Sequence, residues 1–375
     1  MSACTLLALA APSWADVPRD LTALLEPIRK QADLPAMWAA ATSGNGLIAI
    51  GVTGVRRRGD TEAAQADDLL HLGSCTKAMT ADLCAILVTE GTLTWDQSLA
   101  ASFPAQAGAM HEGFRGVTLA QLCTNSGGLP GEPPLELWRE LWEHRVSPMQ
   151  ARQTLLERST AIAPAYPPGT RFEYSNFNFV IAGHVAESAA RQPYEDLIIE
   201  KLFKPLGITS VGFGAPGTPG KLDQPRGHHA AGEAEEPTPD GKGADNPAVV
   251  TPAGRVHMSI SDWAKYAAFH LRGARGEPQK LGPVTLDAEV FKKLHTPPDK
   301  LSDYAFGWET GERSWAGPPK DRRILTHAGS NSMWLAVVWI APGLDRAFLV
   351  VTNQGGPKVD KALDDAIDAM IKELK

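Results

Sequence analysis

Ser74 and Lys77, in the tetrapeptide 74–77, are the residues whose types and spacing point most directly to chemistry. A serine hydroxyl is a weak nucleophile near neutral pH and needs a base beside it. Residues three apart in a helix share a face, so a helix that begins at Ser74 would place the Lys77 amine beside the hydroxyl. If that amine is neutral, or shares its proton with a third group, the pair can attack an acyl carbon.

The sequence around this pair makes a functional reading more convincing than the pair alone. The chain holds 18 serines and 16 lysines, so about one Ser-x-x-Lys is expected by chance. After the pair, apolar residues recur at helical spacing, and Gly91 is a natural stop. These apolar residues are Met79, Leu83, Ile86 and Leu87. The pattern predicts that Ser74 opens a buried amphipathic helix, whose N–H groups and dipole favour negative charge at that end.

Tyr174 and Asn176 form a second candidate part of the site, just before a helical run over 179–187. The chain has 5 tyrosines and 7 asparagines, so a Tyr-x-Asn has roughly a one-in-ten chance of arising at random. A tyrosine before a helix is often only a packed ring with a wet hydroxyl. A phenol beside an ammonium, however, has its pKa lowered, so Tyr174 could relay a proton between Ser74 and a leaving group. The Asn176 amide could hold both Lys77 and a substrate carbonyl.

His327, Gly329 and Ser330 form a third candidate part, just before an apolar run. His-x-Gly is a weak pattern, because two others begin at His71 and His111. Its position gives it weight. A glycine on an edge strand lets a substrate backbone approach, and the Ser330 N–H beside it could point into a cleft.

Two groups of strands at the ends of the chain predict one sheet. Apolar runs at 36–42 and 47–52 flank a Ser-Gly-Asn-Gly turn, a strong hairpin signal. The runs 333–340 and 347–352 are predicted strands joined by a short turn. A helix is predicted over 21–31. A second helix is predicted at the C-terminal end of the chain, where apolar residues form one stripe. The stripe consists of Val359, Leu363, Ile367, Met370 and Leu374. We expect an α+β fold: an α/β sandwich whose antiparallel sheet is flanked by N- and C-terminal helices.

The middle of the chain has a different pattern. Residues 74–211 are mostly helical in periodicity, which predicts an inserted helical domain within a sheet domain of residues 16–73 and 250–375. Residues 212–252 are rich in Gly, Pro and charge without periodicity, so we expect a long loop at the edge of the site.

Composition disfavours several classes of function. The net charge of −7, without a basic cluster, argues against a nucleic-acid partner. No apolar run approaches the roughly 18 residues of a membrane span. No cofactor is expected, because the G-x-G-x-x-G at 212–217 has no strand before it, and Pro216 and Pro219 block a following helix. His228 and His229 lack an accompanying HExxH or CxxC motif, so we interpret them as solvated loop histidines and expect no metal site.

Residues 1–15 resemble a secretory signal, so we expect an exported, periplasmic protein. A short apolar core over 5–11 precedes a small-x-small sequence at 13–15. The alternative is a disordered N-terminus on a cytosolic protein, because no Lys or Arg precedes the apolar core. The three later cysteines are predicted to be buried thiols, because two of them share a helix and the third has no evident partner. They are Cys75, Cys84 and Cys123.

Three short motifs follow one another along the chain: Ser74-x-x-Lys77, Tyr174-x-Asn176 and His327-x-Gly329. Their order, with separations of about 100 and 150 residues, resembles the class C β-lactamase-like serine hydrolases. That family includes penicillin-binding proteins of the D,D-carboxypeptidase kind, class C β-lactamases and esterases on the same fold. Other segments between residues 20 and 355 are also similar to the family: 90–96, 118–122, 126–130, 168–176, 252–254 and 261–262.

The resemblance implies acyl transfer to water through a covalent acyl-enzyme, on a small-molecule or peptide-like acyl substrate. Ser74 would be acylated, and Lys77 with Tyr174 would serve as its base. Asn176 would orient Lys77 and the acyl side chain. The backbone N–H groups of Ser74 and Ser330 would form the oxyanion hole.

The third motif departs from the family at Ala328. Many relatives have Lys-Thr-Gly or His-Thr-Gly there, so His327 would stand where many carry Lys and lend the cleft positive or hydrogen-bonding character. The missing threonine hydroxyl helps relatives bind a substrate carboxylate, and its loss costs of order 1.5–3 kcal/mol, roughly tenfold to a hundredfold in affinity. We therefore favour ester, amide or peptide-like substrates without a carboxylate, although Arg322 or Arg323 could supply a replacement charge.

Two alternatives to this interpretation stay open, and a third is disfavoured. One is a β-lactamase or D,D-carboxypeptidase. A second is a penicillin-binding or sensor protein that is acylated without turnover, because deacylation depends on the placement of a water molecule. A Ser-His-Asp hydrolase is disfavoured, since the sequence contains no G-x-S-x-G nucleophile elbow.

Overall fold

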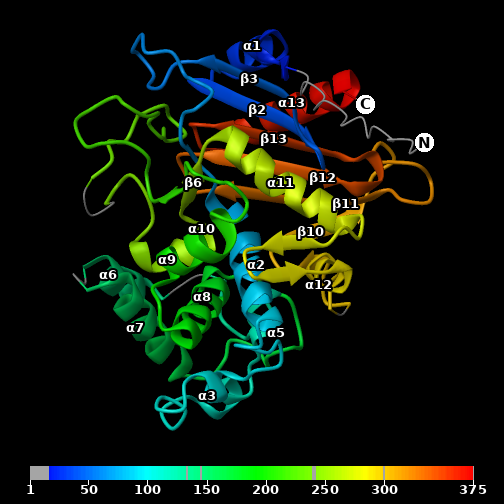
Figure 1. The fold of residues 1–375 in the computed structure, drawn as a ribbon. Helices are drawn as coiled ribbons and strands as arrows, with labels where there is room; N and C mark the ends of the chain where they lie inside the picture. Colours follow the sequence, from blue (N-terminus) through cyan, green and yellow to red (C-terminus); the bar gives the residue numbers. More distant parts are fainter. Residues whose placement is uncertain (1–16, 132–133, 144–145, 239–241, 299, 375) are drawn as a thin grey trace, which may run out of the picture.

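The computed structural model describes residues 17–131, 134–143, 146–238, 242–298 and 300–374. The secretory signal expected over 1–15 lies outside the described residues. Figure 1 shows a sheet between helices in the upper part of the view and a group of helices below it. Within the described chain, no helix has the length and apolar character needed to cross a membrane.

Eight strands of the described chain form one sheet, in the order β1-β3-β2-β13-β12-β11-β10-β9. Their bounds are β1 Arg19–Asp20, β2 Ala36–Ser43, β3 Gly46–Gly54, β9 Tyr304–Ala305, β10 Trp308–Glu312, β11 Arg323–Ser330, β12 Leu335–Ala341 and β13 Arg346–Thr352. Strands from the two chain ends meet where Ala40 of β2 pairs with Leu349 of β13. The predicted antiparallel sheet and α+β fold are confirmed, with the short β1 as a parallel exception.

The central strand β2 is buried on both faces, which explains its nearly continuous apolar sequence. Alternate side chains enter different cores because successive residues of a strand point to opposite faces. Trp38 packs in the larger core, which continues into the helical part of the molecule. Met37 and Ala39 pack in a second core beneath the terminal helices.

Three helices cover the sheet. They are α1 Thr22–Gln31, α13 Val359–Leu374 and α11 Ile260–Ala274. Figure 1 shows α1 and α13 together on one side of the sheet, with α11 lying across the other. All five residues of the predicted apolar stripe of α13 are buried, so burial against the sheet accounts for this helix.

The region between the two groups of strands is mostly helical. Its helices are α2 Thr76–Thr89, α3 Leu99–Ser102, α4 Glu112–Arg115, α5 Leu119–Cys123, α6 Leu135–Glu143, α7 Pro148–Thr160, α8 Asn176–Ala190 and α9 Tyr194–Ile198. The division into a sheet domain and an inserted helical domain stays a prediction. The expectation that α2 is amphipathic is wrong, because every residue from Thr76 to Leu87 is buried. The helix instead runs through the middle of the helical group (Figure 1).

A small three-stranded sheet lies at the start of the nucleophile motif. It consists of β4 Leu70–His71, β6 Val256–Met258 and β5 Gly212–Phe213. The short helix α10, Thr251–Gly254, directly precedes β6, and the 3₁₀ turn η1, Gly73–Cys75, connects β4 to α2. The remaining elements are η2 Ile199–Phe203, η3 Ala248–Val250, β7 Gln279–Leu281, β8 Val284–Leu286, α12 Ala288–Leu294 and η4 Pro342–Leu344.

Parts of the irregular segment 212–252 are buried in the protein. The prediction that both loop histidines are solvated is wrong for His228, which is fully buried. Its Nδ1 lies 2.6 Å from the backbone oxygen of Asn353, and its Nε2 accepts a hydrogen bond from the Arg58 N–H at 3.0 Å. His229 is partly exposed, beside Glu235.

Candidate active site

Ser74 lies in η1, two residues before α2 begins, and Lys77 lies in the first turn of that helix. The Lys77 Nζ atom is 3.0 Å from Ser74 Oγ, which is the proximity predicted from their spacing. The serine is partly exposed, whereas the lysine is fully buried. A reachable hydroxyl therefore stands beside an enclosed amine.

The Lys77 amine has two further partners, and both can only accept hydrogen bonds. Nζ donates to Asn176 Oδ1 at 2.7 Å and to the backbone oxygen of Ala253 at 2.7 Å. A neutral amine has two N–H donors and one lone pair. When these oxygens take both donors, the lone pair is left for the Ser74 hydroxyl proton.

Burial also favours the neutral amine. It lowers the pKa of Lys77 to about 7, because the charged form loses its hydration inside the protein. None of the described side chains that contact Nζ carries a carboxylate. The amine can therefore act as a base near neutral pH.

Tyr174 also lies beside Ser74, and its interaction with the Ser74 hydroxyl opposes the effect of burial on the pKa of the phenol. Its ring centroid is 4.7 Å from Lys77 Nζ. The expectation that the neighbouring amine lowers the pKa of Tyr174 is wrong, because burial of the phenol raises it. A hydroxyl that stays protonated can pass a proton along, and Tyr174 is reachable for this because about 37% of its surface is exposed.

Asn125 holds Tyr174 and Asn176 in place, and the sequence did not identify it. Its Oδ1 accepts a hydrogen bond from the backbone N–H of Ser175 at 3.1 Å, and its backbone oxygen accepts one from Glu173 N–H at 2.9 Å. Asn125 itself has a φ of 54°, a left-handed conformation that asparagine tolerates better than most residues. Its position directly before the family-like segment 126–130 was the available signal.

Ser175 caps α8 by accepting a hydrogen bond from the Phe177 N–H. The cap starts the helix at Asn176, so the amide side chain lies in its first turn. Tyr174 and Asn176 therefore take their positions from one helix start held by Asn125.

The third motif lies on β11, and His327–Ser330 is the part of that strand nearest the nucleophile turn. A methyl group placed on Gly329 would lie 2.7 Å from Ser74 N and 2.0 Å from the backbone oxygen of Leu72. Gly329 is thus required by the close approach of the nucleophile turn, a reason different from the substrate approach expected. The same approach brings Ser330 N near Gly73.

His327 is neutral. Burial and the nearby Lys77 lower the pKa of this imidazole to about 3. Its Nε2 lies 3.3 Å from the hydroxyl of Tyr304, a residue that sequence reasoning missed. Of the two roles expected for His327, hydrogen bonding is retained and positive charge is not.

Neither arginine proposed as a substitute for the missing threonine lies near Ala328. Arg323 begins β11, about 16 Å along the strand from Ala328. Its Nε donates to Asp321 at 2.9 Å. Arg322 stands one residue further away. The exposed Ala328 therefore has no replacement charge from either residue.

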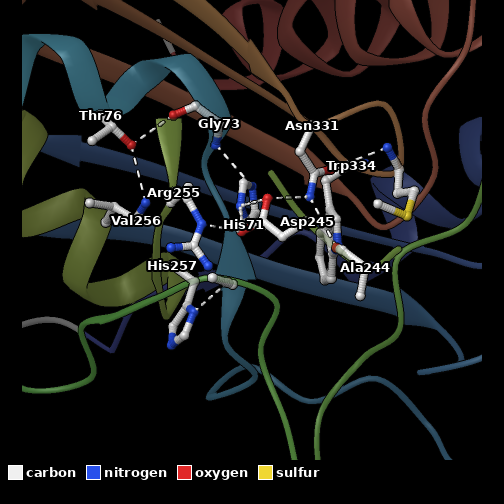
Figure 2. A network of polar contacts seen from close by, with 12 residues as sticks. His71, Gly73, Thr76, Ala244, Asp245, Arg255, Val256, His257, Asn331 and Trp334 are labelled. Carbon is white, nitrogen blue, oxygen red and sulfur yellow. Dashed lines mark hydrogen bonds and ion pairs between the residues drawn. The ribbon is translucent and has the colours of Figure 1, made fainter. Parts of the chain in front are cut away.

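Two other features of the site escaped the sequence. The carbonyl of Ala253 in α10 binds Lys77, and the family-like segment 252–254 pointed to this region without indicating the role of a backbone atom. A buried carboxylate, Asp245, lies among His71, Arg255 and Asn331 close to η1, as Figure 2 shows. Nothing in the aperiodic segment 212–252 singled it out.

A cavity of about 490 Å³ opens beside Tyr174 and Asn176. Its described lining is apolar or uncharged: Gly131, Leu135, Trp138, Tyr174, Asn176, Phe177 and Asn246. Because Tyr174 reaches Ser74 and Asn176 reaches Lys77, the cavity borders the reactive pair. It is large enough to hold a medium-sized apolar group beside this pair.

The three cysteines are free and buried, as predicted. Cys75 lies next to the nucleophile, but burial raises the pKa of its thiol to about 12. It is therefore not a competing nucleophile near neutral pH.

Comparison with known proteins identifies the family. The Beta-lactamase family model matches residues 21–371. The chain is 26% identical to penicillin-binding protein 4 of Amycolatopsis lactamdurans over 307 residues, covering 81% of this chain and 77% of that one. It is 24% identical to D-alanyl-D-alanine-carboxypeptidase/endopeptidase AmpH of Escherichia coli over 332 residues, covering 86% and 80%.

A solved structure agrees with this assignment at the level of the fold. The crystal structure of a class C beta lactamase from Rhodobacter sphaeroides matches with a TM-score of 0.73 at 20% identity, covering 94% of this chain and 98% of that one. Together with the family match over nearly the whole chain, the observations lead to one conclusion. The chain belongs to the Beta-lactamase family and is, as a member of it, a serine hydrolase.

Proposed function

We propose that this protein hydrolyses esters or amides that carry an uncharged, apolar acyl group, through an acyl-enzyme on Ser74. The observation that carries the proposal is the environment of Lys77. Its two other contacts, Asn176 Oδ1 and Ala253 O, take its N–H donors and leave its lone pair for the Ser74 proton. A pKa of about 7 makes the neutral form available where most enzymes work.

Acylation starts when Ser74 Oγ attacks the substrate carbonyl carbon and its proton passes to Lys77 Nζ. The resulting oxyanion is stabilised by the backbone N–H groups of Ser74 and Ser330. The tetrahedral intermediate then collapses, the bond to the leaving group breaks, and that group takes a proton from Lys77 through the Tyr174 hydroxyl. Lys77 returns to its neutral form.

Deacylation repeats these steps with water as the nucleophile. A water molecule attacks the ester carbon and gives its proton to the base that Lys77 and Tyr174 form. The bond between that carbon and Ser74 Oγ breaks, and the serine recovers its proton as the carboxylic acid leaves. His327 takes no proton in this scheme, because its low pKa keeps it neutral throughout.

The preferred acyl group follows from the cavity. Leu135, Trp138 and Phe177 supply apolar surface, and no charged side chain is among its described lining residues. Its volume of about 490 Å³ suits a medium-length alkyl or an aromatic group. Ala328 offers no hydroxyl for a carboxylate, and His327 offers no charge. These features support an uncharged substrate over a β-lactam.

Three probes test the proposal: a fluorescent phosphonate, a series of p-nitrophenyl esters with acyl groups of increasing size, and a chromogenic cephalosporin. We expect phosphonate labelling and ester turnover, both lost in Ser74→Ala and kept in Ser43→Ala, which lies in the β2–β3 hairpin. Absence of labelling in the unchanged protein would refute the nucleophile assignment. Labelling without ester turnover would support the non-turnover penicillin-binding or sensor alternative.

A second candidate is a D,D-carboxypeptidase or β-lactamase, and one structural observation favours it. β10 pairs with β11 only over Arg323–Thr326, so no described strand covers that edge at His327–Ser330. An uncovered strand edge can bind an extended peptide. The relatives named as a penicillin-binding protein and a D-alanyl-D-alanine-carboxypeptidase agree with this direction.

Ala328→Thr separates the two candidates. If the missing hydroxyl disfavours carboxylate substrates, this variant gains cephalosporin or D-Ala-D-Ala peptide hydrolysis by roughly tenfold to a hundredfold. Efficient hydrolysis of the cephalosporin or the D-Ala-D-Ala peptide by the unchanged protein would favour the second candidate. For either candidate we also propose an exported location, which depends on residues 1–15 acting as a secretory signal.

A further inference from the structure

We propose that Asp245 is a positioning residue that fixes the two backbone segments of the oxyanion hole relative to each other. One segment contains Ser74 and the other contains Ser330. The inference deepens the proposed function and rests on it. Asp245 comes from the irregular segment 212–252, yet it is buried and lies between both segments.

The first contact of Asp245 reaches the nucleophile turn through His71. Nε2 of His71 lies 3.0 Å from both carboxylate oxygens, and Nδ1 accepts a hydrogen bond from the backbone N–H of Gly73 at 3.2 Å. Because Nδ1 accepts, Nε2 is the ring nitrogen that carries the proton and donates to Asp245. The carboxylate thus selects the tautomer that holds Gly73, the residue before Ser74.

The second contact reaches β11 through Asn331, the residue after Ser330. Asn331 Nδ2 donates to Asp245 Oδ1 at 3.1 Å. Its Oδ1 accepts hydrogen bonds from the N–H groups of Met333 at 3.2 Å and Trp334 at 3.1 Å. Asp245 therefore also holds the side chain that organises the turn directly after Ser330. Figure 2 shows His71 of β4 and Asn331 of the turn after β11 approaching Asp245.

The two segments touch each other beside this carboxylate. Gly73 has a φ of 48°, and a methyl group on it would lie 2.3 Å from Ser330 N. A small rotation of either segment would therefore change the separation between the Ser74 and Ser330 N–H groups. Hydrogen-bond donors stabilise an oxyanion only over a narrow range of distance.

Asp245 is held as an anion, so its hydrogen bonds are charge-assisted. Burial alone would raise its pKa, but the hydrogen bond from His71 and the charge of Arg255 oppose burial and hold the pKa below its usual range. Arg255 Nε donates to Oδ2 at 3.2 Å and balances the charge. The described groups that interact with the carboxylate include His71, Arg255, Asn331, the backbone of Asn246 and, through charge, His257.

The first test is kinetic, with Asp245→Asn and Asp245→Ala in the full chain. The oxyanion exists only near the transition state, so we expect kcat for a p-nitrophenyl ester to fall about tenfold to a hundredfold while KM changes less than about threefold. Asn keeps the shape of Asp, so its loss should be smaller than that of Ala. The matched control is Asp223→Asn in the same segment, where an exposed carboxylate accepts from Thr218 and contacts neither part of the oxyanion hole. Unchanged kcat in both Asp245 variants would overturn the proposal.

A second test needs no activity, so it also decides the matter if the proposed hydrolase function fails. His71→Asn keeps an acceptor for the Gly73 N–H but removes the contact between residue 71 and Asp245. Asn331→Ala removes the contact between Asp245 and the turn after Ser330. If Asp245 connects the two segments, the double variant shifts the urea unfolding midpoint by less than the sum of the single shifts. Additive shifts would show that the segments are held independently and would overturn the proposal. Absence of phosphonate labelling with non-additive shifts would reject the hydrolase function alone.

Discussion

Gly73 and Gly329 lie against each other without side chains between their two backbones. A methyl group on Gly73 would reach within 2.5 Å of the Gly329 carbonyl carbon, and one on Gly329 would lie 2.7 Å from Ser74 N. The nucleophile turn and strand β11 therefore approach as closely as backbones can. This contact brings the first and third sequence motifs together, although about 250 residues separate them.

We expect Gly329→Ala to lower kcat/KM for esters at least about a hundredfold, because the added methyl group would overlap Leu72 O and Ser74 N, which are backbone atoms. The overlap should also lower the free energy of unfolding by about 1–3 kcal/mol. Ester kinetics and urea unfolding measure the two effects. The control is Gly311→Ala on the neighbouring strand β10, where the nearest atom would be an ordinary 3.7 Å away. Equal activities of the two variants would contradict this account.

The pH dependence of kcat/KM should have an acid limb set by Lys77. If the neutral amine is the base, as proposed, its pKa of about 7 means that activity should rise with pH through about 7 and then level off. Asn176→Asp would place a carboxylate at the position of an atom 2.7 Å from Nζ, which favours the ammonium and should move the limb to higher pH by one unit or more. Rate profiles from pH 5 to 10 measure the shift. A limb that stays in place, or moves to lower pH, would contradict Lys77 as the base.

Tyr174→Phe distinguishes a proton relay from a base. Burial raises the pKa of Tyr174, so its hydroxyl stays protonated over the working range. Removing it should lower kcat by about a hundredfold by slowing proton transfer to the leaving group, while the acid limb near pH 7 persists. Lys77→Ala should abolish the acid limb and should lower the activity more than Tyr174→Phe does. If Tyr174→Phe abolishes the limb, the phenol is the base instead.

The sequence predicts the parts of the site that depend on local spacing. Ser74 and Lys77 meet because residues three apart share a helix face, and the antiparallel sheet follows from apolar patterns at both chain ends. Asp245 could not be predicted, because its contact with His71 spans 174 residues and its surrounding sequence has no periodicity. Ala253 could not be predicted either, because it acts through a backbone oxygen that every residue has.

Electrostatic properties were the least predictable. The pKa of Tyr174 was expected to fall because of the neighbouring amine, yet burial raises it. His327 was a candidate cation, yet burial beside Lys77 leaves it neutral. The size of a desolvation effect depends on how completely distant segments cover a group, and neighbouring residues in the sequence do not contain that information.

A buried ion-pair cluster should stabilise the helices around α8. Arg152 is fully buried and donates to Glu187 at 2.8 and 2.7 Å and to Glu195 at 3.0 Å. Arg152→Met would leave the buried Glu187 carboxylate without this partner, so we expect the free energy of unfolding to fall by about 3–5 kcal/mol. The control is Arg158→Met on the same helix, because Arg158 is exposed and its partner Glu140 is partly exposed; the effect should stay under about 1 kcal/mol. Similar urea midpoints for both variants would contradict the assigned role of burial.

Trp138 should determine how large an acyl group the site accepts. It lines the cavity beside Tyr174 and Asn176, and an aromatic contact with an apolar acyl chain contributes about 1.5–3 kcal/mol. Trp138→Ala should therefore lower kcat/KM for p-nitrophenyl octanoate or phenylacetate at least about tenfold, relative to its effect on the acetate. Trp142→Ala is the control, because Trp142 lies one turn further along α6 and is not among the lining residues. If Trp138→Ala lowers all esters equally, or if Trp142→Ala changes the preference as much, the acyl group binds elsewhere and the apolar preference loses its structural basis.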